Sequence, residues 1–255
     1  MSRRKPAPFF GQRLSFLADS KKHISFLWKD RASPSSGRIL RIIFRRKEGV
    51  DSMLPQSFFA RDTVQVAREL IGKYLIRRYN GVTLAARITE TEAYIGRMDK
   101  ACHAYQYRRT ERTKPLFSSP GTAYVYLIYG MYCCLNLVTE PEGEPAAVLI
   151  RGAEPRYGAD ILAQNRFGCG AGEMTDYQRK NFMNGPGKLC AALNIDRALN
   201  ALPYGSPELE VCEKLSEAGL PDFPLDSSPR EIKVSKRIGI DYAEEARDFL
   251  WRFYY

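Results

Sequence analysis

The sequence predicts a mixed α+β protein, because it contains both β-hairpin patterns and capped helices. Asn80-Gly81, the favoured two-residue hairpin turn, separates the β-rich stretches 74–79 and 82–91. Tyr129-Gly130 separates a second pair, 122–128 and 131–137, rich in tyrosine and branched aliphatic residues. Asp62, followed by Gln65, is typical of a helix N-terminus. We therefore expect antiparallel strands with helices packed against them.

The remaining elements extend this pattern. Val66, Leu70 and Ile71 share one face of the helix that Asp62 begins, and Gly72 suits its end. A further strand is expected at 146–151 and a helix near 159–166, followed by a Gly-rich loop. The stretch Asn184-Gly185-Pro186-Gly187-Lys188 is typical of a loop that begins another helix.

Charge divides the chain into two parts. Residues 1–52 hold 13 Lys and Arg against 4 Asp and Glu, whereas residues 53–255 hold 26 against 25. We interpret 1–52 as a disordered basic arm and 53–255 as the folded domain, although an organelle transit peptide or a translation start at Met53 would also fit. No apolar run approaches the length that crosses a membrane.

Cysteine and histidine usage argues against a zinc site. None of the six cysteines forms a C-x-x-C pair, and the chain has only two histidines, His23 and His103. The neighbours Cys133 and Cys134 are typical of small buried thiols in a reducing compartment. We expect an intracellular protein, in the cytoplasm or nucleoid of a bacterium or in the nucleus or an organelle of a eukaryote.

Glu92 is the first candidate for chemistry. In Thr89-Glu90-Thr91-Glu92 the two glutamates face one side of a strand and the two threonines the other. A carboxylate near the end of a strand, beside Tyr94 and a histidine-bearing loop, can act as a general base on water. By itself such a glutamate is more often a solvated side chain, so its neighbours decide the interpretation.

Tyr129 is the second candidate, because a large aromatic residue before glycine stabilises a turn poorly but makes a good wedge. A wedge that enters a DNA base step unstacks it at a cost of a few kcal/mol. Stacking an extruded base on aromatic side chains returns about 1–3 kcal/mol per contact, and Tyr94, His103 and Tyr126 are candidates for this. Each tyrosine taken singly also fits an ordinary strand position.

The stretch Gly185-Pro186-Gly187-Lys188 is not a Walker A loop, because Phe182 and Leu189 occupy the positions that such a loop needs. It could bind a single DNA phosphate through backbone N–H groups and Lys188. A turn that merely leads into a helix explains the same residues.

Together these residues resemble the alkyladenine (3-methyladenine) DNA glycosylases, also called methylpurine DNA glycosylases. The resemblance spans almost all of residues 54–255 and leaves the N-terminal arm outside. The matching stretches are Thr91-Glu92-Ala93-Tyr94-Ile95-Gly96 with His103 following, 121–136 (GTAYVYLIYGMYCCLN), Val148-Leu149-Ile150-Arg151, Gly185-Pro186-Gly187-Lys188-Leu189-Cys190, and Arg237-Ile238-Gly239.

The resemblance implies a single domain, 53–255, around a curved antiparallel sheet with a β-hairpin that projects into the DNA minor groove. Tyr129 would replace the flipped nucleotide, and Tyr94, His103 and Tyr126 would stack on the extruded base. Glu92 would be the general base and Arg151 would help to hold the water. Asn136 would disfavour the amine of normal guanine.

The implied reaction is base excision repair of damaged double-stranded DNA by a monomer, with no cofactor and no membrane. The base would be an alkylated or deaminated purine of the 3-methyladenine, 7-methylguanine, hypoxanthine and ethenoadenine class. Water would capture an oxocarbenium-like sugar and leave an abasic site without cutting the strand. The sequence does not rank these lesions.

Two alternatives remain open at this stage. The same fold could be a non-catalytic lesion-binding module, which the presence of Glu92 disfavours. A hydrolase of free nucleosides would need no wedge, so the presence of Tyr129 at the hairpin tip disfavours this alternative.

Two departures from the family pattern also matter. The chain stops soon after Arg252-Phe253-Tyr254, which could loosen the last strand. The acidic stretch 141–145 leaves the placement of Arg151 less secure than that of Glu92.

Overall fold

The computed structural model describes residues 53–222 and 230–255, so the expected basic arm, 1–52, lies outside the described residues. An eight-stranded antiparallel sheet forms the centre, with its main path in the order β3-β4-β5-β2-β1-β6. β8 pairs with β2 and β7. The strands are β1 (Tyr74–Tyr79), β2 (Val82–Ile95), β3 (Ala123–Ile128), β4 (Tyr132–Val138), β5 (Ala146–Tyr157), β6 (Leu209–Cys212), β7 (Lys233–Ser235) and β8 (Arg252–Tyr254).

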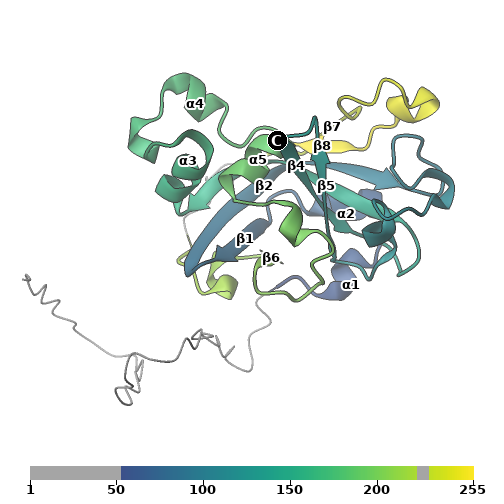
Figure 1. The fold of residues 1–255 in the computed structure, drawn as a ribbon, viewed down its shortest axis with the longest axis horizontal. Coiled ribbons are helices and arrows are strands. Elements are labelled where there is room, and N and C mark those ends of the chain that lie inside the picture. The colour runs from purple at the N-terminus through teal and green to yellow at the C-terminus, as the bar shows by residue number, and fades with distance from the viewer. Residues whose placement is uncertain (1–52, 223–229) are drawn as a thin grey trace, which may run out of the picture. The chain divides into compact units, whose positions relative to one another are not determined.

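Helices and long loops surround the sheet. The C-terminal segment, drawn in yellow, lies on the opposite side of the view from α3 and α4 (Figure 1). The α-helices are α1 (Gln56–Phe59), α2 (Thr63–Glu69), α3 (Ala159–Phe167), α4 (Asp176–Lys180) and α5 (Pro186–Ala192). The short 3₁₀ helices are Tyr105–Tyr107, Lys114–Phe117, Ala171–Glu173, Arg197–Leu199, Leu215–Ala218 and Glu244–Asp248.

The mixed α+β prediction is confirmed, and the turn signals account for it. Asn80 and Gly81 both have positive φ, as a type I′ turn requires, and β1 pairs with β2 directly across them. Asp62 caps α2 by accepting a hydrogen bond from the N–H of Gln65 at 2.9 Å. β2 is longer than expected and continues to Ile95, because β5 pairs with it as far as Ala146.

The two faces of the sheet have different surroundings. On one face Val125, Leu135 and Ile150 form the main core with residues of α2, α3 and α5. On the other face Tyr124 and Ala147 pack with Leu116, Phe117 and other residues of the 96–121 loop. Side chains alternate between the faces along each strand. Thr91 faces α2, where its hydroxyl donates to the carbonyl of Ala67 at 2.7 Å, so Glu92 faces the other way.

The last strand is paired on both edges, by β2 and by β7.

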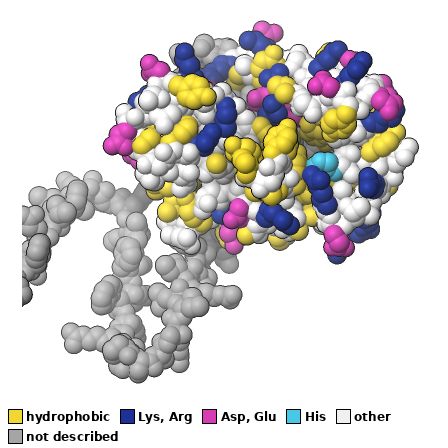
Figure 2. Space-filling view, turned by 45° about the horizontal axis from the view of Figure 1, so that its top comes forward, with side chains coloured by type: hydrophobic (Ala, Val, Ile, Leu, Met, Phe, Trp, Pro, Cys, Tyr) yellow, Lys and Arg dark blue, Asp and Glu magenta, His cyan; other side chains and the backbone are white. Residues whose placement is uncertain are grey.

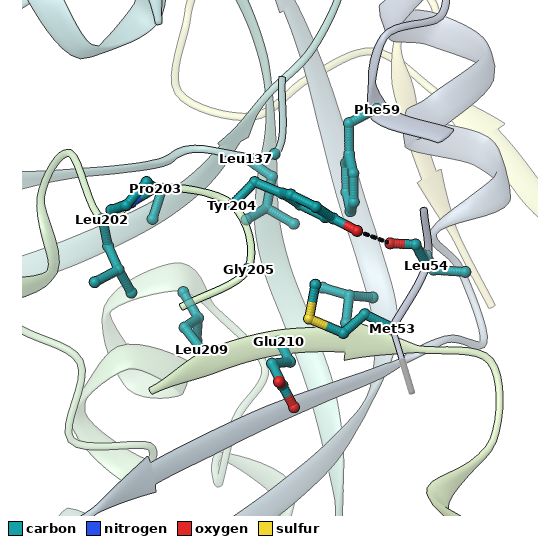
Figure 3. Close-up of a pocket in the computed structure, with 13 residues that line it drawn as sticks. Met53, Leu54, Phe59, Leu137, Leu202, Pro203, Tyr204, Gly205, Leu209 and Glu210 are labelled. Carbon is teal, nitrogen blue, oxygen red and sulfur yellow. Dashed lines mark hydrogen bonds between the residues drawn. The ribbon is translucent and has the colours of Figure 1, made fainter. Parts of the chain in front are cut away.

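Near the start of the described chain, the carbonyl of Leu54 accepts a hydrogen bond from the hydroxyl of Tyr204 at 3.0 Å, beside Phe59 (Figure 3). The pocket around this bond holds about 20 Å³, which is room for about one water molecule. It is therefore too small to be a ligand site.

No helix among residues 53–222 and 230–255 has the length and hydrophobicity needed to cross a membrane. All six cysteines are free thiols.

Candidate active site

A pocket of about 290 Å³ lies on the face of the sheet that the 96–121 loop partly covers. Four of its residues form one row across four strands, because Glu92 pairs with Leu149, Leu149 with Asn136, and Asn136 with Tyr124. Neighbouring strands lie about 4.8 Å apart, so Glu92 and Tyr124 stand roughly 14 Å from one another across this row. The predicted site residues that line the pocket are Glu92, Tyr94, His103, Tyr126, Tyr129, Asn136 and Arg151.

Glu92 is fully buried, and a donor holds each of its carboxylate oxygens. The backbone N–H of Ile238 donates to Oε1 at 2.9 Å, and the hydroxyl of Tyr94 donates to Oε2 at 2.8 Å. Burial raises the pKa of Glu92, while Arg151 and the two donors partly oppose that rise. Each oxygen retains a second lone pair. The carboxylate is thus fixed in direction and more basic than an exposed one.

Arg151 lies beside Glu92 on the neighbouring strand. Its Nε is 2.9 Å from Oε1 of Glu90 and 3.7 Å from Oε1 of Glu92. The shorter contact is electrostatic, because the N–H of this Nε is not aligned with any acceptor. Glu90 in turn accepts a hydrogen bond from Nε of Arg252 in β8. The last strand therefore supports the position of Arg151.

Aromatic side chains form the opposite wall of the pocket. The rings of His103 and Tyr126 meet edge to face with centroids 4.7 Å apart, and those of Tyr124 and Tyr126 lie 5.3 Å apart at 35°. Burial raises the pKa of Tyr126 and, to about 12, that of Tyr124. Both phenols therefore stay neutral at physiological pH. The wall suits the flat face of an uncharged or cationic ring.

His103 is held in one orientation by two neighbours. Its Nδ1 lies 2.9 Å from the hydroxyl of Tyr124, and its Nε2 lies 3.4 Å from a guanidinium nitrogen of Arg112. Arg112 can only donate, so Nε2 accepts and Nδ1 carries the proton. Burial, and then the charge of Arg112, lowers the pKa of His103 to about 4. His103 is thus a neutral stacking surface and not a ready source of protons at neutral pH.

Asn136 projects into the pocket from β4. It is buried, and its amide nitrogen donates to the carbonyl of Tyr124 at 3.1 Å. That bond fixes the orientation of the side-chain amide. Asn136 can therefore test the exocyclic groups of a ligand by hydrogen-bond match or steric clash.

Tyr129 lies at the tip of the β3–β4 hairpin and is 83% exposed. It has φ +53° and Gly130 has φ +72°, so both turn residues are in the left-handed region that favours glycine. Met131, at 69% exposed, extends the apolar tip. Figure 2 shows a face on which apolar side chains lie together near its centre with Lys and Arg side chains around them. An exposed apolar tip of this kind suits contact with an apolar surface of another molecule.

Lys188 does not line the pocket. It lies in the first turn of α5, where its ammonium donates to the side-chain oxygens of Asn181 at 2.8 Å and Asn184 at 3.0 Å. The neighbouring Pro186 lines the pocket. Gly187 is packed so closely that an added Cβ would meet Tyr132 at 2.9 Å. α5 therefore supports the base of the hairpin.

Sequence reasoning missed three parts of this site. Arg112 holds His103 and lies 5.5 Å from the centre of the Tyr126 ring. Tyr242 and the segment 238–240 line the pocket from a C-terminal loop. The Arg237-Ile238-Gly239 motif stood out in the sequence, but its contact with Glu92 spans 146 positions of the chain and no local pattern reveals it.

Comparisons with known proteins point to one family. The sequence pattern of the methylpurine-DNA glycosylase (MPG) family matches residues 57–255. A relative from Clostridium perfringens (strain 13 / Type A), provisionally named a 3-methyladenine DNA glycosylase, is 52% identical over 201 residues, which are 79% of this chain and 94% of the relative. One from Clostridioides difficile (strain 630), with the same provisional name, is 48% identical over 202 residues, which are 79% of this chain and 99% of that protein.

Proposed function

Because this chain belongs to the methylpurine-DNA glycosylase family, we propose that it excises alkylated or deaminated purines from double-stranded DNA by hydrolysing their N-glycosidic bond. The observation that carries the proposal is the buried Glu92, which two donors hold at the edge of a pocket with an aromatic wall. We place this activity in residues 53–255.

The reaction needs one general base and one water molecule placed to attack C1′ of the sugar. Glu92 accepts a proton from a water molecule while the water oxygen bonds to C1′ of the sugar. The bond between C1′ and the base nitrogen breaks, and its electron pair leaves with the purine. The carboxylate also stabilises the positive charge that develops on the sugar. Arg151, beside Glu92, helps to hold the water. The product is free base and an abasic site.

Binding uses the rest of the site. Tyr129 enters the base stack in place of the flipped nucleotide, where its ring partly replaces the stacking that the nucleotide loses. Tyr94, His103 and Tyr126 contact the extruded purine, and Asn136 disfavours the exocyclic amine of guanine. Lys188 can release its amide partners to contact a DNA phosphate, since neutral amides hold an ammonium less strongly than a phosphate does.

The decisive experiment compares the native chain with Glu92→Gln on two substrates, a duplex with one hypoxanthine and methylated genomic DNA. The amide keeps the size of the side chain but cannot accept the proton. Base release should fall by at least about 100-fold while lesion binding persists. Glu111→Gln, at an exposed loop position, is the matched control and should release base at the native rate.

The alternative of a lesion-binding module without hydrolysis has a distinct outcome in the same assay. The native chain would then bind both lesions and release neither base. Equal release by the native chain and Glu92→Gln would instead remove Glu92 from the mechanism.

A further inference from the structure

A buried ion pair lies behind the pocket, between residues far apart in the chain. Arg237 donates from its two terminal nitrogens to the carboxylate of Asp99 at 2.5 and 2.8 Å, and both side chains are fully buried. The same two nitrogens donate to the carbonyls of Ala93 at 2.8 Å and Ala246 at 3.0 Å. One guanidinium thus joins β2, the 96–121 loop and the C-terminal segment.

Stability alone gives a weak reason for this pair. Removing two charges from water costs about as much as their attraction returns, and well-packed apolar residues often replace such pairs without loss. A bidentate pair does fix orientation, because the planar guanidinium matches the carboxylate at two points.

Arg237 holds the backbone donor of Glu92. It directly precedes Ile238, whose N–H donates to Oε1 of that carboxylate. Four hydrogen bonds fix the Arg237 side chain, so the next peptide group has little freedom to turn away.

Arg237 also contacts the side-chain donor of Glu92. Its guanidinium lies 4.7 Å from the centre of the Tyr94 ring and 5.1 Å from that of Trp251. The hydroxyl of the same Tyr94 donates to Oε2 of Glu92. Both carboxylate oxygens are therefore bound by groups that rest on one arginine.

We propose that Arg237 is a positioning residue, which holds in place the two hydrogen-bond donors that orient the carboxylate of Glu92. Asp99 acts with it, because it supplies the charge and the two acceptors that keep the guanidinium buried. Asp99 is itself anchored, since it accepts a hydrogen bond from the N–H of Ala101 at 2.9 Å. The proposal rests on the proposed role of Glu92 as base.

A test of Arg237 by pH dependence also depends on the other titratable and charged groups near Glu92, which the variants leave in place. From β2 they are Glu90 and Tyr94, from β5 Arg151, and from the hairpin Tyr126 and Cys134. Among the described contacts, none of these side chains hydrogen-bonds to Arg237 or Asp99, although the Tyr94 ring lies against the guanidinium of Arg237. Changing the ion pair therefore alters the environment of Glu92 chiefly through Ile238 and the Tyr94 ring.

The test uses Arg237→Lys and Asp99→Asn in the full chain, with Lys100→Ala as control. Lys100 adjoins Asp99 but pairs at the surface with Glu244 and Glu245. In the two variants single-turnover base release should fall about 10–100-fold, the effect of loosening a hydrogen bond to a charged group. Lesion affinity should stay within about threefold in both, and in Arg237→Lys, which keeps the charge of the pair, the midpoint of the pH–rate profile should move to higher pH. Lys100→Ala should match the native chain in all three measurements.

A carboxyl titration by NMR separates this proposal from the proposed function. The pKa of Glu92 should be higher in Arg237→Lys, which keeps the charge of the pair, than in the native chain, whether or not either releases base, because the carboxylate has lost firmly placed donors. An unchanged pKa with an unchanged pH profile would overturn the positioning role. So would variants that do not fold, since the pair would then serve the fold as a whole.

Discussion

The region around Arg237 and the tip of the β3–β4 hairpin both adjoin the pocket, which Ile238 and Tyr129 line, and they are built in opposite ways. Arg237 and Asp99 are fully buried and hydrogen-bonded to each other. Tyr129 is 83% exposed and has the backbone conformation that suits glycine. A group that must stabilise charge gains from being fixed before the substrate arrives. A group that must enter another molecule has to remain uncovered in the free protein, at some cost in stability.

The hairpin tolerates this tip because its base is well packed. Leu135 and Val125 belong to the main core, and Gly187 of α5 allows Tyr132 to approach closely. A left-handed conformation costs a residue with a side chain roughly 1–2 kcal/mol. Strain of that size is confined to one turn and leaves the strands below it paired.

Among the changes that test this contrast between the two regions, replacing Tyr129 with Asn should reduce base release the most. Asn-Gly is the favoured type I′ turn, so the hairpin keeps its shape while the wedge is lost. The flipped state then loses a few kcal/mol of support, and kcat/KM on a hypoxanthine duplex should fall about 30–100-fold. The measurement is single-lesion base release under subsaturating conditions.

Tyr177→Asn is the matched control for this prediction. Tyr177 is a tyrosine on α4 with a similar exposed fraction, 75%, and does not line the pocket. Its replacement should leave kcat/KM within about twofold. Equal losses in the two variants would mean that exposed tyrosines act only through general contact with DNA, and that the tip is no wedge.

The buried region also marks the limit of what the sequence reveals about the fold. Local patterns predict both hairpins, because Asn80-Gly81 is a favoured turn and two β-rich stretches flank Tyr129-Gly130. The capping of α2 by Asp62 is equally local. The short strands β6 and β7, which have four and three residues, carry too few positions for a period to stand out. Their pairing depends on strands elsewhere in the chain.

The site divides in the same way. Alternation along β2 places Glu92 and Tyr94 on one face, and this period of two is visible in the sequence alone. The row that joins Glu92 to Asn136 and Tyr124 depends on the registers of three strand pairs, which no local pattern sets. Resemblance to a family supplies Glu92 and Asn136 without the geometry, and it does not single out Tyr124. The Arg237–Asp99 contact spans 138 positions and appears only in the folded chain.

The pH dependence of base release should report the raised pKa of the buried Glu92. Glu92 must be ionised to accept a proton, and burial raises its pKa above the ordinary 4.5. The rate should therefore fall about tenfold per pH unit below a midpoint that lies above 4.5. The pKa of His103, about 4, keeps it neutral above pH 5, so it should add no second step between pH 5 and 8.

Arg151→Gln sharpens this prediction. Removing the nearest positive charge should move the midpoint to higher pH, because Arg151 is the main group that lowers the pKa of Glu92. Arg156→Gln is the control, since Arg156 lies on the same strand and pairs with Glu154 at 2.8 Å. A midpoint that shifts equally in both variants would show that general charge, and not the local pair, sets the basicity of Glu92.

The smallest expected effect is on stability, and it has the opposite sign to the effect on activity. Asn adopts a positive φ at less cost than Tyr, and an 83% exposed side chain has few contacts to lose. Tyr129→Asn should therefore raise the free energy of unfolding by about 1 kcal/mol, which is about 2–4 °C in Tm for a domain of this size. Tyr177→Asn should stay within about 0.5 kcal/mol, because Tyr and Asn have similar helix propensities. Thermal unfolding followed by circular dichroism measures both. A gain in stability together with the loss of activity would show that Tyr129 is kept for function although another residue would make the turn more stable. An unchanged Tm would mean that the turn carries no strain and that the two regions differ only in exposure.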